Sequence, residues 1–109
     1  MLRGLPEPYW VSFPDQVQFA GGRPVFAPAG GERMRPTFRD IESVASERTR
    51  GVIINSPCNP TGAVIDAAEL RKIIEWCASR DCFLIFDETY EFFVYNGAEH
   101  VSAARWMNE

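Results

Sequence analysis

The sequence has 109 residues, of which 46% are hydrophobic and 24% are charged, and its formal net charge is -4. This length and balance are typical of a single globular domain and exclude a disordered tail, a collagen-like chain and a membrane-spanning helix, which needs roughly 18–20 consecutive apolar residues. The weak acidity argues against nucleic acid and membrane partners, and residues 1–8 have no apolar stretch typical of a secretory signal.

Extended and helical patterns alternate along the first half of the chain. Residues 23–27 follow a Gly-Gly pair and predict a short strand, and the Pro- and Gly-rich residues 28–31 predict a surface loop. Thr37 can cap the helix that follows, and Asp40 places a carboxylate in its first turn. Apolar residues with helical spacing extend this predicted helix to about Glu47.

Two apolar runs flank the clearest helical pattern. Residues 51–55 and 82–86 are continuously apolar, as expected for strands that are covered on both faces. Asp66, with Glu69 three residues later, predicts a helix that starts with a capping box. The apolar stripe of this helix comprises Leu70, Ile73, Ile74, Cys77 and Ala78. Strand, helix and strand within about 35 residues form a βαβ unit, which predicts an α/β fold with a parallel sheet.

The cysteines and the single histidine suggest no site. Cys58, Cys77 and Cys82 are odd in number and form no CxxC pair, so neither a metal site nor a disulfide framework is expected. Cys77 lies on the apolar stripe and is expected to be a small buried hydrophobic residue in a protein of the reducing cytoplasm. His100 has no evident partner, and we assign it no catalytic role.

Polar and turn-forming residues follow both apolar runs. Ligands of open parallel sheets bind outside the carboxyl ends of the strands, so these residues are the first place to expect a site. Taken singly, each motif has an ordinary structural interpretation. Residues 59–62 (Asn-Pro-Thr-Gly) are typical of a tight turn, Asp87 of a helix cap or ion-pair partner, and Tyr90 of a surface aromatic residue.

Taken in order, the motifs resemble those of class I/II, fold-type I aminotransferases of the aspartate aminotransferase type. Residues 59–62 and the Asp-Glu-Thr-Tyr motif at 87–90 begin 28 residues apart, a spacing typical of that family. Upstream, residues 8–14 resemble the family's aromatic segment, and residues 20–25 resemble its turn into the next strand. Four ordered motifs at suitable spacings make coincidence a poor explanation.

The resemblance implies a fold, a cofactor and partners. Residues 1–109 would be a central part of the large domain, a partial three-layer α/β sandwich with a mostly parallel sheet and flanking helices. The cofactor would be pyridoxal 5'-phosphate, and the substrates an amino acid and a 2-oxo acid. The full-length protein would be a cytoplasmic homodimer. Which amino acid it uses stays open.

The resemblance also implies roles for four side chains. Asp87 matches the carboxylate that keeps the pyridine nitrogen of the cofactor protonated, because an adjacent negative charge favours the charged form. Asn59 and Tyr90 match the two donors to the anionic oxygen of the ring, and Trp10 matches the aromatic residue that stacks on it. Trp10 and Asn59 would also contact the substrate.

No residue of the chain matches the lysine that the family uses to hold the cofactor as a Schiff base. The only lysine, Lys72, precedes Asp87 and lies on the polar face of the predicted helix, so we expect a solvated side chain and an inactive chain. The preferred interpretation is a fragment of an aminotransferase. Two alternatives stay open: an aminotransferase-like, effector-sensing domain of a transcription regulator, and a remnant that binds no cofactor.

Overall fold

The computed structural model describes residues 5–7, for which it describes the backbone alone, and residues 12–28, 35–58, 61–92, 94, 97 and 99–106. Two residues of the expected cofactor site, Trp10 and Asn59, lie outside these ranges. Along the chain the elements are β1 (Leu5–Glu7), α1 (Ser12–Phe19), β2 (Phe26–Pro28), α2 (Phe38–Val44), β3 (Gly51–Asn55), α3 (Ala67–Ser79), β4 (Phe83–Asp87) and a 3₁₀ turn, η1 (Ala103–Trp106).

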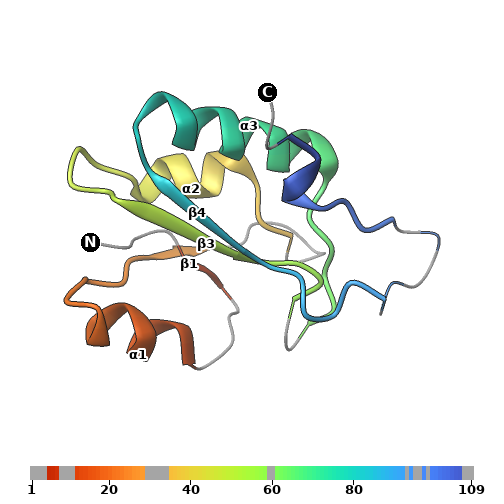
Figure 1. Ribbon diagram of the computed structural model, residues 1–109, viewed down its shortest axis with the longest axis horizontal. Helices are drawn as coiled ribbons and strands as arrows, with labels where there is room; N and C mark the ends of the chain where they lie inside the picture. The colour runs from red at the N-terminus through yellow and green to blue at the C-terminus, as the bar shows by residue number, and fades with distance from the viewer. Residues whose placement is uncertain are drawn as a thin grey trace.

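The strands form the middle of three layers. α2 and α3 cover one side of them, and α1 covers the other (Figure 1). β1 pairs with β2 and β3 pairs with β4, both in parallel. This arrangement confirms the predicted α/β sandwich and its parallel strands. The β3–β4 register places Asn55 opposite Asp87, so both strands end at the same edge.

β3 is the central strand of the core. Val52 and Ile54 pack on the side of α2 and α3, while Ile53 packs against Phe13 and Val17 of α1. None of these five side chains is more than 5% exposed. A strand with cores on both faces needs apolar residues at consecutive positions, which is why residues 51–55 show no alternation.

β4 is covered on one face only. Leu84 and Phe86 pack against the core of α2 and α3, whereas Phe83 is 73% exposed and Ile85 is 45% exposed on the other face. The expectation of a strand covered on both faces is therefore wrong for β4 within the described structure. The strand also runs one residue further than predicted, so Asp87 is its last residue.

A capping box starts α2, as Thr37 and Asp40 predict. The Thr37 amide donates to Asp40 Oδ2 at 2.9 Å, and the Asp40 amide donates to Thr37 Oγ1 at 3.3 Å. The helix ends at Val44, three residues before the predicted end at Glu47, because Ala45 is already extended with ψ 151°. Helix ends are poorly specified by apolar spacing alone.

Glu69 connects the two helices on this side of the sheet. Asp66 caps α3 by accepting the Ala68 amide at 2.8 Å, but the predicted capping box with Glu69 is not formed. Instead, Glu69 Oε2 accepts the amide of Phe38 in the first turn of α2 at 2.7 Å, and Oε1 accepts Lys72 Nζ at 2.8 Å. The carboxylate therefore stabilises the N-terminus of a helix far away in sequence.

Replacing Glu69 by Ala should lower the free energy of unfolding by about 1–2 kcal/mol, because the Phe38 amide loses a charged acceptor. Bonds from Lys72 and from the Phe38 amide lower the pKa of Glu69 from its ordinary value of 4.5. Its contribution should therefore be present above pH 4.5 and be lost as the pH falls through the lower folded-state pKa. Urea unfolding of wild type and variant over this range measures the difference.

The matched control is Glu42→Ala, an exposed glutamate on α2. This change should alter the free energy of unfolding by no more than about 0.5 kcal/mol at any pH. A Glu69→Ala loss that stays the same from neutral to acid pH would contradict the assigned role of the carboxylate.

The sequence patterns predict neither β1, α1 nor η1. The signal for α1 was present: Phe13 and Val17 are four residues apart and both buried, and Pro14 lies in the first turn, where proline is tolerated. The predicted strand over residues 23–27 is displaced, since β2 begins only at Phe26. Apart from Pro28, the predicted loop over 28–31 lies outside the described residues.

α3 confirms two predictions for single side chains. Cys77 is buried in the core, and burial raises the pKa of its thiol to about 12. Lys72 is exposed and pairs with Glu69 three residues earlier on the same helix. Within the described ranges, no helix has both the length and the apolar character needed to cross a membrane.

Candidate functional site

The carboxyl ends of β3 and β4 are held together at their last residues. The main-chain carbonyl of Asp87 accepts the Ser56 amide at 3.0 Å and the side-chain amide of Asn55 at 3.2 Å. These two bonds extend the β3–β4 ladder to the end of β4. The backbone from which the Asp87 side chain projects is thereby fixed from the neighbouring strand.

The Asp87 carboxylate is oriented by the turn that follows it. Its Oδ1 accepts the Thr89 amide at 3.0 Å and the Thr89 hydroxyl at 2.6 Å. Aspartate often makes this local bond to the backbone two residues on. A carboxylate can accept about four hydrogen bonds, so these two leave capacity for a ligand. The side chain is half-buried, which leaves it accessible at the strand edge.

The segment after β3 is also tightly organised on both sides of Asn59. The buried hydroxyl of Ser56 accepts the Ile65 amide at 2.9 Å. Further along, the Gly62 amide donates to the Cys58 carbonyl at 2.7 Å. Gly62 has φ 73°, a left-handed conformation that glycine adopts without steric cost. These bonds hold the described residues around the Asn-Pro-Thr-Gly motif at the same strand edge as Asp87.

The predicted site residues are only partly within the described structure. Asp87 ends β4, and Tyr90 lies three residues later in the turn after it, with 38% of its surface exposed. The structure thus brings these two residues to the edge where the sequence predicts a ligand. The predictions for Trp10 and Asn59 lie outside the described residues. The cofactor-binding roles of all four residues stay predictions.

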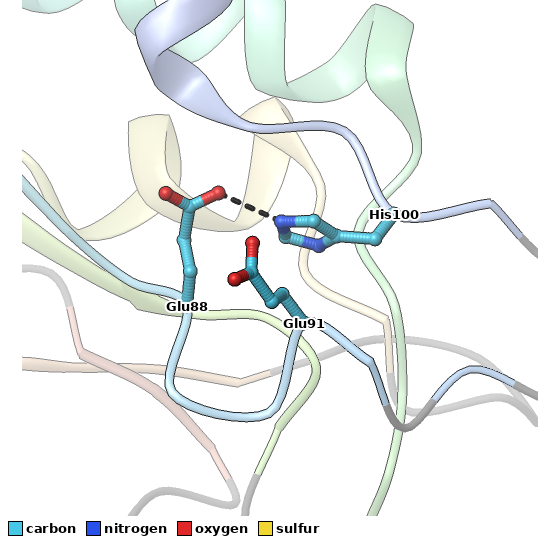
Figure 2. A group of neighbouring side chains, drawn as sticks. All are labelled: Glu88, Glu91 and His100. Atoms are coloured by element: carbon cyan, nitrogen blue, oxygen red, sulfur yellow. Dashed lines mark hydrogen bonds and ion pairs between the residues drawn. The ribbon is translucent and has the colours of Figure 1, made fainter.

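The expectation that His100 has no partner is wrong. Its Nε2 lies 2.7 Å from Glu88 Oε1 (Figure 2). The Ser102 hydroxyl donates to the other oxygen of the same carboxylate, Glu88 Oε2, at 3.0 Å. The imidazole also stacks on Phe86, with ring centroids 6.2 Å apart and ring planes inclined by 17°. The two residues are 12 positions apart in sequence, so no local periodic pattern predicts their contact.

Comparison with known proteins identifies the family. The sequence model of the family aminotransferase class I and II matches residues 5–109. The chain is 47% identical to the probable aspartate/prephenate aminotransferase of Aquifex aeolicus, covering 96% of the chain and 27% of that protein. It therefore spans about a quarter of the length of such relatives.

Solved structures agree with this assignment. The aromatic aminotransferase from Pyrococcus horikoshii superposes with a TM-score of 0.86 at 40% identity, covering 92% of this chain and 27% of that one. The aspartate aminotransferase from Thermus thermophilus with maleate superposes with a TM-score of 0.87 at 37% identity, covering 95% and 27%. Enzymes of this family depend on pyridoxal phosphate. The chain belongs to the class I and II aminotransferases.

Proposed function

We propose that this chain forms one wall of the pyridoxal-phosphate site of an aminotransferase, within the large domain of that enzyme. The observation that supports the proposal best is the placement of Asp87. Its carbonyl is held by β3, and its half-buried carboxylate is oriented by Thr89 at the strand edge. Ligands of α/β sheets bind at this kind of edge.

The donor set suits the cofactor. Asp87 supplies a negative charge that would keep a ring nitrogen protonated, and Tyr90 supplies a hydroxyl that would donate to an anionic ring oxygen. When bound, pyridoxal phosphate acts as an electron sink for the substrate Cα. We assign Asn59 a second bond to the ring oxygen and a contact to the substrate carboxylate. We assign Trp10 the stacking surface that orients the ring and borders the substrate.

Lys72 is unsuited to hold the cofactor. Its ammonium lies 2.8 Å from Glu69, its side chain is 55% exposed, and it projects from α3 rather than from the end of a strand. A chain of these 109 residues alone is therefore proposed to be inactive. The lysine, the phosphate-binding residues and a substrate-binding arginine would come from other parts of a full-length homodimer.

The substrates of the complete enzyme are proposed to be an amino acid and a 2-oxo acid. Relatives of this chain are named as aspartate, aspartate/prephenate and aromatic-amino-acid aminotransferases. These names support transamination rather than the sensing domain of a transcription regulator.

The test uses the natural polypeptide that carries this sequence. After incubation with pyridoxal phosphate and removal of the free cofactor, it should retain a visible absorbance band that changes when an amino acid is added. The pure 109-residue chain should transaminate no amino acid faster than free pyridoxal phosphate does. Absence of the band in the natural polypeptide would favour a remnant that binds no cofactor. Cofactor-dependent turnover by the short chain would refute its proposed inactivity.

A further inference from the structure

Two residues of the segment after residue 98, His100 and Ser102, contact the end of β4 and the residue that follows it. His100 stacks on Phe86, and its Nε2 bonds to Glu88. Ser102 donates to the second oxygen of Glu88, and its own hydroxyl oxygen accepts the Ala104 amide at 3.2 Å. We call Glu88, His100 and Ser102 the clamp. Both carboxylate oxygens of Glu88 are used, so the clamp depends on this residue.

The clamp acts on the residues immediately before and after Asp87. Phe86 and Glu88 contact the same imidazole, and Phe86 packs against the core cluster that residues of α3 and η1 also contact. Figure 1 shows α3 and η1 on one side of β4. Successive side chains of a strand point to opposite faces, so the Asp87 carboxylate is directed away from the clamp. The clamp therefore leaves the approach to Asp87 open while it holds the backbone on either side of it.

A metal site is a less suitable interpretation of the same cluster. Glu88, Glu91 and His100 each place one potential ligand atom within 4.8 Å of the others (Figure 2). However, both Glu88 oxygens and His100 Nε2 already make hydrogen bonds inside the protein, which leaves the buried Nδ1 of His100 as the one nitrogen of that ring without a partner in the described part of the chain. Glu91 is exposed, and its carboxylate makes no hydrogen bond within the described part of the chain.

We propose that Glu88 is a positioning residue for Asp87: by holding His100 and Ser102 it fixes the strand end from which the Asp87 carboxylate projects. The inference rests on the proposed function, in which that carboxylate faces the ring nitrogen of the cofactor. The Thr89 amide is a built-in reporter, because it donates to Asp87 Oδ1 at 3.0 Å. If the strand end loosens, this amide exchanges its hydrogen faster.

The experiment compares three variants of the natural polypeptide. Glu88→Ala removes both clamp bonds. His100→Phe keeps an aromatic ring against Phe86 but removes the bond to Glu88. If Glu88→Ala does not fold, this second variant tests whether the clamp positions Asp87. Glu91→Gln is the matched control, a neighbouring exposed glutamate outside the clamp. Hydrogen exchange is followed in peptides that cover Thr89, alongside the absorbance band of the bound cofactor, kcat and KM.

In Glu88→Ala we expect exchange at Thr89 to rise about tenfold or more, as local opening becomes easier. The absorbance band of the bound cofactor should differ from that of the wild type. The kcat should fall by about 10–100-fold while KM stays within about threefold of the wild-type value, because orientation of the cofactor rather than substrate binding is lost. His100→Phe should show the same changes to a smaller degree, and Glu91→Gln should match the wild type.

Two results would overturn the inference. One is wild-type exchange at Thr89 in both clamp variants. The other is faster exchange with an unchanged cofactor band and unchanged kcat per bound cofactor, which would make the clamp merely structural. A wild-type protein without any cofactor band would instead refute the proposed function. The exchange comparison alone would then still decide whether the clamp holds the strand end.

Discussion

Replacing Asp87 by Asn should reduce the kcat for transamination by the natural polypeptide by about 10²–10³-fold, the cost of removing one preorganised electrostatic group from an active site. Asn has nearly the same shape and keeps a side-chain oxygen that can accept the Thr89 amide and hydroxyl. What it removes is the negative charge that would keep the ring nitrogen of the cofactor protonated. Initial rates over a range of amino-acid concentrations measure the effect.

The control for this variant is Asp81→Asn, which makes the same chemical change six residues earlier. Asp81 is exposed and has φ 53°, a left-handed conformation that Asn also tolerates. Its kcat should stay within about twofold of the wild type, since surface substitutions have small effects. If both variants lost activity equally, or if Asp87→Asn stayed fully active, Asp87 would not be the residue that pairs with the cofactor.

The fold could be predicted where buried residues form a recognisable apolar pattern in the sequence, either a continuous run or a helical stripe. β3 has cores on both faces, so Val52, Ile53 and Ile54 are all apolar, and the strand could be recognised without any structure. α3 could be recognised from its stripe, of which Leu70 and Ile73 are fully buried. β3 is thus recognised by a continuous apolar run, and α3 by an apolar stripe with helical spacing.

Features that depend on contacts between residues far apart in sequence could not be predicted in this way. β4 is a continuous apolar run like β3, yet Phe83 and Ile85 are exposed, because composition does not say which face of a strand is covered. Glu69 has the spacing of a capping box, but its carboxylate turns to α2 instead. Phe38 lies 31 residues away in sequence, and local patterns carry no information about such a neighbour.

The candidate site likewise has a part that could be predicted from the sequence and a part that could not. Asp87 and Tyr90 could be placed at a strand edge because ligands bind where parallel strands end. The clamp that holds this edge could not be predicted, since Glu88 and His100 are 12 positions apart in sequence and no periodic pattern links them. Residues that touch a ligand often belong to motifs, whereas the residues that support them are found only from their contacts.

Replacing Ile73 by Ala should lower the free energy of unfolding by about 2–5 kcal/mol, the range for large-to-small changes in a packed core. Ile73 is 0% exposed and lies in the cluster that α2, α3 and β3 share. Removing three carbon atoms there leaves a cavity that the sheet and the neighbouring helix cannot easily fill, because the surrounding side chains are themselves close-packed. Urea unfolding, followed by tryptophan fluorescence, to which Trp76 on the same helix contributes, measures the loss.

Arg71→Ala is the matched control, on the exposed face of the same helix. Arg71 Nε lies 3.0 Å from Glu75 Oε1, and both side chains are more than half exposed, so losing this pair should cost no more than about 0.5 kcal/mol. Both variants place alanine in one helix, so differences in helix propensity largely cancel and the remaining difference reports burial. Equal losses in the two variants would mean that α3 is held by its own helical stability and not by the core beneath it. The clamp and the β4 edge would then lack the rigid support that positioning of Asp87 requires, since η1 packs on that same core.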